Sequence, residues 1–380
     1  MTDADPNVPA TSVPQGGNMT DQTVRAPQTV TRTPRTRSEG EAAYLEVTDL
    51  HVQFPTADGK VQAVQGLSYS LPLRRTLAIV GESGSGKSVS SMAILGLHDR
   101  KSTWVSGSIK VGGKEVVGMS EKELMNYRGV DAAMIFQDPQ SSLHPFFTVG
   151  DQIMESYRAH HNVTKRAAKA RAVDMLGRVG IPNPERRIDQ YPHEFSGGMR
   201  QRAMIAMALV NDPKLLIADE PTTALDVTVQ AQILDLIADL QRDFGSAVVF
   251  ITHDLGVVAE IADDILVMYA GNAVEHGPVE KILGTPLHPY TWGLLESIPA
   301  VSGTPGALHP IPGTPPSLLA VPSGCAFHPR CEFRERVGGD LCRTLKPELI
   351  PRTADLGRTS RCHLKEPDKV FETEIQPRLP

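Results

Sequence analysis

The feature that most constrains this sequence is a glycine-rich loop between a short apolar run and a segment with helical spacing. The loop, residues 81–88, reads GESGSGKS and fits the pattern G-x-x-x-x-G-K-[ST] at every fixed position. The run TLAIV over 76–80 predicts a strand buried on both faces, and SVSSMAILGL after the loop suits a helix. This order of strand, loop and helix predicts a phosphate-binding loop and makes a chance glycine–serine turn the weaker alternative.

The loop predicts specific contacts with a nucleotide. Glycines let the backbone N–H groups turn inward around phosphate oxygens, and the following helix adds the positive end of its dipole. We expect Lys87 to reach the β and γ phosphates and the Ser88 hydroxyl to ligate Mg²⁺. The predicted nucleotide-binding residues of the loop are Gly81, Glu82, Ser83, Gly84, Ser85, Gly86, Lys87 and Ser88.

Two more buried runs, LLIAD over 215–219 and AVVFIT over 247–252, alternate with helical stretches. This alternation predicts an α/β fold with a mainly parallel sheet. Asp219 ends the first run and is expected to hold Mg²⁺ directly or through water, while Glu220 would polarise the attacking water. The alternative for this pair is a role as helix-capping charges. His253 follows the second run and is expected to bond the γ-phosphate, because ligands gather at the carboxyl ends of such strands.

Composition and charge exclude several classes of protein. The chain has 380 residues, enough for two or three domains. Its 38 Lys and Arg against 44 Asp and Glu give a net charge of −6, which argues against nucleic acid as a partner. An uninterrupted apolar run of about 18 residues is missing, so we expect no membrane-spanning helix. The first residues carry aspartates and no apolar signal segment, so we expect a cytosolic chain.

Composition shifts along the chain predict its organisation. The first segment is rich in Thr, Pro and Gln and poor in large apolar residues, which is typical of disorder. Order is expected from Tyr44, with LEVTDLHVQF as a half-buried strand and VQAVQGLSYSL as a short strand pair. The predicted parts are a disordered tail (1–43), an ATPase domain (44–280) with a helical insertion (about 141–200), a cysteine-bearing module (281–366) and a tail (367–380).

The segment FSGGMRQR, followed by LLIADEP and TTALD, resembles the ATP-binding-cassette (ABC) family. Ser196, Gly197 and Gly198 of this segment are expected to begin an apolar helix, whose N-terminal end would be a second anion-binding site. The resemblance implies a P-loop ATPase cassette with a RecA-like core, an antiparallel β subdomain and a helical subdomain. It also implies a head-to-tail dimer, in which each ATP lies between one subunit's phosphate loop and the other's SGG helix.

The same resemblance implies roles for three further residues. Gln137 in MIFQDP is similar to the residue that contacts Mg²⁺ or the lytic water and couples to membrane subunits. Asp226 in TTALD is similar to the aspartate of the loop between the two cassettes. Phe54 matches the aromatic residue that stacks on adenine, with packing in the core as the alternative.

Further motifs, among them HPYTWGLLESIP and IPGTPPSLLAVPSGCAFHPRC, resemble the ATPases of oligopeptide and dipeptide importers over residues 44–365. The resemblance implies a sister ATPase subunit, two permease subunits and an extracytoplasmic substrate-binding protein. It places the chain on the cytoplasmic face of the inner membrane and implies peptide uptake driven by ATP hydrolysis. The alternatives are a related importer for nickel chelates or glutathione, a soluble ABC ATPase outside transport, and a regulatory nucleotide-binding module without hydrolysis.

The four cysteines all lie near the end of the chain: Cys325, Cys331, Cys342 and Cys362. A reducing cytosol disfavours disulfides, and four thiolates suit either zinc or an iron–sulfur cluster. The resemblance to the importer ATPases implies a [4Fe–4S] cluster. Zinc, with His328 and His363 as substitute ligands, and four inert buried thiols are the alternatives.

Overall fold

The computed structural model describes residues 42–223, 225–298, 309–352 and 357–379. Contacts divide the chain into residues 1–33 and 34–380, and every described residue lies in the second unit. The N-terminal tail predicted over 1–43 falls outside the described residues except for its last two positions. Among the described helices, none is both long and apolar enough to cross a bilayer.

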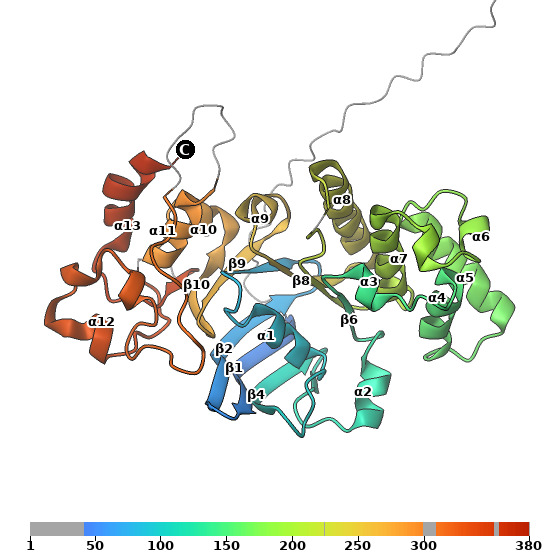
Figure 1. The fold of residues 1–380 in the computed structure, drawn as a ribbon, viewed down its shortest axis with the longest axis horizontal. Coiled ribbons are helices and arrows are strands. Elements are labelled where there is room, and N and C mark those ends of the chain that lie inside the picture. The colour runs from blue at the N-terminus through green and yellow to red at the C-terminus, as the bar shows by residue number, and fades with distance from the viewer. Residues whose placement is uncertain (1–41, 224, 299–308, 353–356, 380) are drawn as a thin grey trace, which may run out of the picture. The chain divides into compact units, whose positions relative to one another are not determined.

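The larger sheet carries the strands that position the phosphate loop, in the order β11-β10-β9-β3-β8-β7-β6 (Figure 1). Strands β9, β3, β8, β7 and β6 run parallel, β10 pairs antiparallel with β9, and β11 pairs antiparallel with β10. The bounds are β3 Thr76–Val80, β6 Ala132–Ile135, β7 Leu215–Asp219, β8 Ala247–Thr252, β9 Asp264–Tyr269, β10 Asn272–Pro278 and β11 Thr359–Ser360. The three predicted buried strands are confirmed as β3, β7 and β8, and every residue in them is buried.

The smaller sheet is antiparallel, in the order β2-β1-β4-β5. Its strands are β1 Ala43–Thr56, β2 Gly59–Pro72, β4 Trp104–Val111 and β5 Lys114–Glu115. The prediction of a strand pair within β2 is wrong, because one strand pairs with β1 along its whole length. Gly66, with φ of 74°, lies where the register shifts between Gln65 and Leu67, so this glycine makes a bulge and no turn.

The predicted helical insertion forms a group of helices beside β6 (Figure 1). The α-helices from the phosphate loop to the end of this insertion are α1 Lys87–Ile94, α2 Glu121–Tyr127, α3 Pro139–Ser142, α4 Val149–Arg158, α5 Lys165–Arg178, α6 Pro184–Arg187 and α7 Gly197–Leu209. Ile153, Met175 and Ile205 are fully buried where α4, α5 and α7 pack on one another. This core continues onto β7 and β8, so the insertion and the sheet share one apolar interior.

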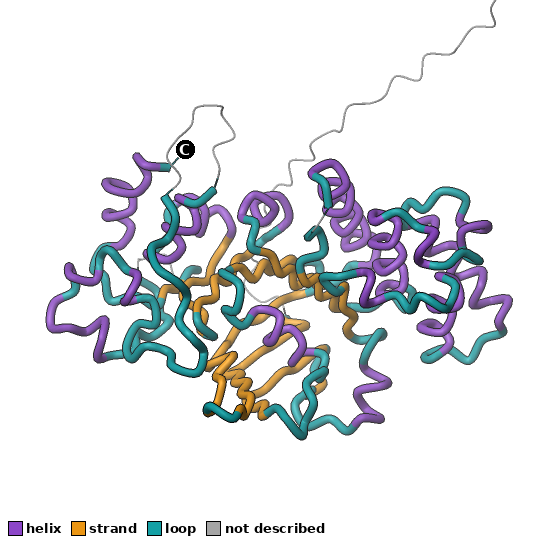
Figure 2. The backbone as a smooth tube through the Cα atoms, in the orientation of Figure 1, coloured by secondary structure: helices purple, strands orange, loops and turns teal. Residues whose placement is uncertain are grey.

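The remaining α-helices follow β7 in the chain. Figure 2 shows the helices in purple and the strands in orange. The α-helices after β7 are α8 Val227–Phe244, α9 Leu255–Ile261, α10 Val279–Gly284, α11 Pro289–Glu296, α12 Leu341–Thr344 and α13 Pro367–Val370. The tail expected over 367–380 differs from the structure, because α13 continues into a further helical turn, Phe371–Ile375. Phe371 and Ile375 are 0% and 1% exposed, since their spacing puts both on one helical face against the core.

The C-terminal region shares its apolar core with the ATPase domain. Phe327, Phe333 and Phe371 belong to a buried cluster that includes residues of β3, β9 and β10. The rings of Trp292 and Phe333 meet edge to face with centroids 5.0 Å apart. Strand β11 also extends the larger sheet. The described residues of this region therefore pack onto the ATPase domain through a shared apolar cluster.

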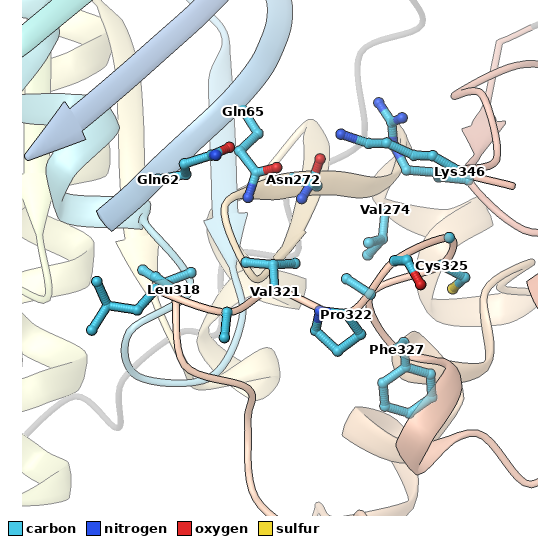
Figure 3. A pocket seen from close by; sticks show the side chains of 16 residues that line it. Gln62, Gln65, Asn272, Val274, Leu318, Val321, Pro322, Cys325, Phe327 and Lys346 are labelled. Atoms are coloured by element: carbon cyan, nitrogen blue, oxygen red, sulfur yellow. The ribbon is translucent and has the colours of Figure 1, made fainter. Parts of the chain in front are cut away.

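A cavity of about 310 Å³ lies where the C-terminal segment meets both sheets (Figure 3). Gln62 and Gln65 line it from β2, Asn272 lines it from β10, and Cys325 lines it from the C-terminal segment. The Gln62 amide N–H donates to the Leu318 carbonyl at 3.2 Å beside it. This bond connects the segment just before Cys325 to β2, which precedes β3 and the phosphate loop.

Candidate active site

The phosphate loop connects β3 to α1, and its shape requires glycine. Gly81 and Gly86 have φ of 153° and 100°, values that side chains of L-residues rarely tolerate. A Cβ atom at Gly81 would lie 2.2 Å from the Met268 carbonyl oxygen, and one at Gly86 would lie 2.3 Å from that of Ala63. Gly86 is also the residue that precedes α1. The backbone therefore bends tightly ahead of a helix N-terminus, as a phosphate cradle needs.

Lys87 lies inside this loop. Its Nζ donates to the carbonyl oxygens of Gly81 at 2.6 Å and Glu82 at 3.1 Å, and the residue is 6% exposed. Burial lowers the pKa of Lys87, against the opposing effect of the nearby carboxylates of Glu220 and Asp219. The amine is held at the centre of the loop, where it can exchange these carbonyl oxygens for phosphate oxygens.

Ser88 and Asp219 pair beside the loop. The Ser88 hydroxyl donates to Asp219 Oδ1 at 3.0 Å, and Asp219 is 5% exposed. Burial raises the pKa of Asp219, while the hydrogen bond from Ser88 acts in the opposite direction. A hydroxyl and a carboxylate side by side are the oxygen ligands that Mg²⁺ takes, so these two residues fit the predicted metal site.

Glu220 is surrounded by three polar side chains. Gln137 Nε2 donates to its Oε2 at 3.1 Å, and Thr223 Oγ1 donates to the same oxygen at 3.1 Å. His253 Nδ1 lies 3.3 Å from Oε1. Glu220 has φ of 45°, an uncommon value for a residue with a side chain and one found where function fixes the backbone. The structure thus brings together the predicted Gln137, Glu220 and His253.

Neither Asp219 nor Glu220 caps the helix that follows them, so the alternative role of this pair as helix caps is wrong. The cap of the next helix, α8, is Asp226, whose side chain accepts the Val229 N–H at 3.0 Å. Thr223 is a partner of Glu220 that the sequence reasoning missed. The only sequence signal for it is a hydroxyl three residues after the carboxylate.

A cavity of about 660 Å³ joins these groups, which is ample for a nucleotide. It is lined by Glu82, Ser83, Gly84, Ser85, Gly86, Lys87, Ser88, Val89, Gln137, Glu220, His253 and Pro315. Pro315 was not predicted at this site; it comes from the proline-rich segment that follows α11 in the sequence. The loop, the carboxylate and the imidazole therefore face one space.

Ser196, Asp226 and Phe54 are among the predicted nucleotide contacts that do not line this cavity. Ser196, at the start of α7, is exposed, and its hydroxyl accepts the Met199 N–H at 3.3 Å. Asp226 is likewise exposed at the start of α8. Phe54 packs edge to face on His98 with ring centroids 5.7 Å apart, and it is partly buried against the core. Ser196, Asp226 and Phe54 are therefore absent from the lining of the nucleotide cavity in this chain.

The four cysteines line one small cavity in the C-terminal region, together with His328 and His363. Burial raises the pKa of Cys325 to about 11 and that of Cys331 to about 12. Ring nitrogens of the two histidines lie 2.8–2.9 Å from main-chain carbonyl oxygens. Within the described ranges, no three His, Cys, Asp or Glu side chains converge as ligands of one metal ion, so neither the predicted iron–sulfur cluster nor the zinc alternative gains support from this geometry.

The fold and the site define a class of protein. Three features together are typical of an ABC ATPase. They are a phosphate loop in a mainly parallel sheet, a carboxylate pair after a neighbouring strand, and a helix that begins with SGG in a helical insertion. The structure of the ATP-binding cassette MJ0796, dimeric and bound to ADP and Pi, covers 62% of this chain and 98% of that one, with a TM-score of 0.56 at 24% identity. CbiO1 from Clostridium perfringens, part of the ABC transporter complex cbiONQ, gives a TM-score of 0.55 at 28% identity over 64% of this chain and 91% of its own.

Sequence comparison narrows the class. The ABC transporter family model matches residues 64–223, and the model of the oligopeptide/dipeptide transporter C-terminal region matches residues 274–337. The oligopeptide transport ATP-binding protein OppD of Bacillus subtilis is 55% identical over 77% of this chain and 82% of its own length. The dipeptide transport protein DppD of the same organism is 52% identical over 76% and 87%. OppD of Salmonella typhimurium is 51% identical over 76% and 85%.

This chain belongs to the family of oligopeptide and dipeptide ABC-transporter ATP-binding proteins. The resemblance found in the sequence is confirmed, and so is the prediction of an ATPase of that transport family. The match to the C-terminal family model ends at residue 337, so it includes Cys325 and Cys331 and stops before Cys342 and Cys362.

Proposed function

We propose that this chain is the ATP-hydrolysing subunit of an ABC importer that powers uptake of dipeptides and oligopeptides across the cytoplasmic membrane. The observation that carries the proposal is Glu220, held by Gln137, Thr223 and His253 at the wall of the phosphate-loop cavity. The names of relatives at 51–55% identity supply the transport process and the peptide class.

The proposed chemistry is attack of water on the γ-phosphate in line with the leaving oxygen. Glu220 accepts the proton of that water, and Gln137 and His253 orient its carboxylate through bonds to both oxygens. Lys87 leaves its loop carbonyls to bond the β and γ phosphates. Ser88 and Asp219 would hold Mg²⁺, which supplies positive charge against the phosphate oxygens. Preorganised donors of this kind stabilise the charge that develops in the transition state.

We propose that a second cassette completes each nucleotide site. Ser196 and Gly197 are exposed at the start of α7, where the helix N-terminus is open to an anion from another molecule. Val227, next to Asp226, is 83% exposed and is therefore available for contact with a second cassette. The related cassette MJ0796 forms a dimer with ADP and Pi, which supports this arrangement. The partner is proposed to be a sister chain.

We propose that the permease subunits contact the region just after Gln137. Phe146 and Phe147, between α3 and α4, are 81% and 54% exposed. Adjacent exposed aromatic side chains favour a protein contact that buries them. Because Gln137 also bonds Glu220, such a contact would connect the permease to the hydrolytic carboxylate. The chain would then act on the cytoplasmic face of the inner membrane, with a substrate-binding protein on the opposite side.

The proposal is tested with the complex that co-purifies with this chain from membranes. We expect two permease subunits and a sister ATPase, and we expect vesicles holding the complex to take up peptide with its binding protein and ATP. Nickel-chelate or glutathione uptake in place of peptide would favour the related importers. Recovery with ribosomes and without permease subunits would contradict transport and favour a soluble ABC ATPase.

We propose further that the four cysteines hold a [4Fe–4S] cluster. All four line one cavity, and a cube-shaped cluster spaces its ligands more widely than a single ion does. The Leu364 N–H points at Cys362 Sγ at 3.4 Å, a bond that also suits a cluster-bound thiolate. A bound cluster would crosslink the C-terminal segments. Iron and acid-labile sulfide in equal amounts, lost in Cys362→Ser, are expected; zinc in their place would contradict the proposal.

A further inference from the structure

Arg330 forms an ion pair with the phosphate loop from far along the chain. Its Nη1 lies 2.6 Å from Glu82 Oε2, and its Nη2 lies 3.0 Å from Glu82 Oε1. Arg330 belongs to the short turn His328–Arg330 and is 7% exposed. A guanidinium that meets both carboxylate oxygens is a strong and geometrically specific pair. The C-terminal region therefore reaches the second residue of the loop through a buried charge.

The same guanidinium holds a proline-rich strap, defined here as residues 309–316. Arg330 Nε donates to the Pro312 carbonyl oxygen at 2.7 Å, and Nη2 lies 3.4 Å from two neighbouring strap carbonyls. Pro315 of this strap lines the nucleotide cavity. One side chain thus fixes both the phosphate loop and a wall of the cavity in front of it.

Two buried tyrosines complete the support of the loop. The Glu82 backbone N–H donates to the Tyr290 hydroxyl at 2.7 Å. Arg330 Nη1 lies 3.4 Å from the Tyr269 hydroxyl, and the two tyrosine rings pack with centroids 4.6 Å apart. Both the main chain and the side chain of Glu82 are therefore held by residues outside the loop.

The charge of Glu82 gives this pairing a consequence for nucleotide binding. A carboxylate in a phosphate loop repels the phosphates that the loop must bind, and the repulsion grows where water is scarce. Arg330 offsets that charge through the two contacts to the carboxylate. Removal of the guanidinium alone would leave the negative charge of Glu82 facing the nucleotide. Removal of both charges would not.

We propose that Arg330 is a positioning residue for ATP: it neutralises Glu82 and fixes the proline-rich strap as a wall of the nucleotide cavity. The inference rests on the proposed nucleotide site at residues 81–88. The next residue, Cys331, lines the cysteine cavity. The cysteine region is therefore one residue away from the group that sets the charge of the phosphate loop.

A double-mutant cycle in the assembled transporter tests the proposal, with ATP affinity, KM and kcat as readouts. Arg330→Gln should weaken ATP binding at least about tenfold, because it leaves Glu82 unpaired. Glu82→Gln should bind ATP more tightly than the unaltered protein. The double variant should recover an affinity within about threefold of the unaltered protein, because the two effects are coupled. Arg330→Lys keeps the charge and should retain more affinity than Arg330→Gln.

Arg334→Gln is the matched control, because it removes a half-exposed arginine of the next turn that pairs with Glu335 and not with the phosphate loop, and it should leave ATP affinity unchanged. Equal losses in Arg330→Gln and the double variant would overturn the proposal and make Arg330 a structural crosslink alone. If Arg330→Gln does not fold, weaker ATP binding by Glu82→Gln overturns the proposal and tighter binding supports it. If Lys87→Ala binds ATP as well as the unaltered protein, the proposed nucleotide site itself has failed.

Discussion

The side-chain amide of Gln137 donates to Glu220 Oε2 at 3.1 Å, although 83 residues separate the two in the chain. Sheet register explains the contact. Gln137 follows β6 and Glu220 follows β7, and these parallel strands pair with Ile135 opposite Ala218. The next strand, β8, ends one residue before His253. Three neighbouring strand ends therefore deliver the amide, the carboxylate and the imidazole to one place, as expected for a ligand site in a parallel sheet.

The first prediction concerns Glu220. Glu220→Gln should lower the ATPase rate of the assembled transporter by at least about 10²-fold, because the amide cannot accept the proton of the attacking water. ATP binding and dimer closure should remain, since the amide keeps the size of the side chain. Phosphate release and nucleotide affinity are the measurements. Glu280→Gln, at an exposed position of α10, is the control and should keep the unaltered rate. Steady turnover by Glu220→Gln would refute the assignment of the base.

The second prediction concerns the oxygen pair beside the loop. Ser88→Ala removes the donor that the buried Asp219 carboxylate accepts, so that carboxylate loses its hydrogen bond. We expect the Mg²⁺ concentration for half-maximal ATPase rate to rise about tenfold, because the metal ion loses one of its two proposed side-chain oxygen ligands. Ser88→Thr retains a hydroxyl and should stay close to the unaltered protein. An unchanged Mg²⁺ requirement in Ser88→Ala would remove Ser88 from the metal site.

The third prediction tests the fold of the C-terminal end. Phe371 is fully buried and its ring lies 6.2 Å from that of Trp292. Phe371→Ala should lower the free energy of unfolding by about 3–5 kcal/mol, the range for truncation of a buried aromatic side chain. Glu372→Ala, on the exposed side of the same turn, should have little effect. Equal unfolding free energies of the two variants in chemical denaturation would contradict this packing and favour the predicted tail over residues 367–380.

Sequence reasoning succeeded where the signal is local. The loop over 81–88 can be recognised because glycine, lysine and serine occupy fixed positions in its sequence. Strands β3 and β8 can be recognised because each is a nearly continuous apolar run. The carboxylate pair ends another such run. In each case the residues that define the feature are neighbours in the chain, so the pattern can be recognised without knowledge of the tertiary structure.

It failed where a contact joins distant segments. Arg330 looks like any arginine beside a cysteine, and its partner Glu82 lies 248 residues away. Tyr290 reaches the Glu82 backbone over 208 residues. No periodicity or spacing encodes such pairs, because tertiary packing alone creates them. The same limit explains the end of the chain, where a short charged helix looked like a tail and is fixed by Phe371 in a core assembled from elsewhere.

The last prediction concerns a buried carboxyl outside the nucleotide cavity. Glu275 in β10 is 0% exposed and accepts hydrogen bonds from the Thr291 hydroxyl at 2.6 Å and the His288 N–H at 3.1 Å. Burial raises the pKa of Glu275 from 4.5 to about 7, although these bonds favour the ionised form. The folded protein therefore holds a proton that the unfolded chain has lost. That contribution to stability is complete below pH 4.5 and is lost as the pH rises through about 7.

Thr291→Val removes the shortest side-chain donor to this carboxyl and keeps the volume of the residue. We expect a loss of about 1–3 kcal/mol in unfolding free energy, larger at pH 8 than at pH 5, because the ionised carboxylate needs the donor more than the neutral acid does. Urea unfolding of the full chain at both pH values measures it. Thr291→Ser keeps the hydroxyl and should lose less of the pH-dependent part. A loss that is equal at the two pH values, or larger at pH 5, would mean that Glu275 does not titrate in the folded protein as its burial implies.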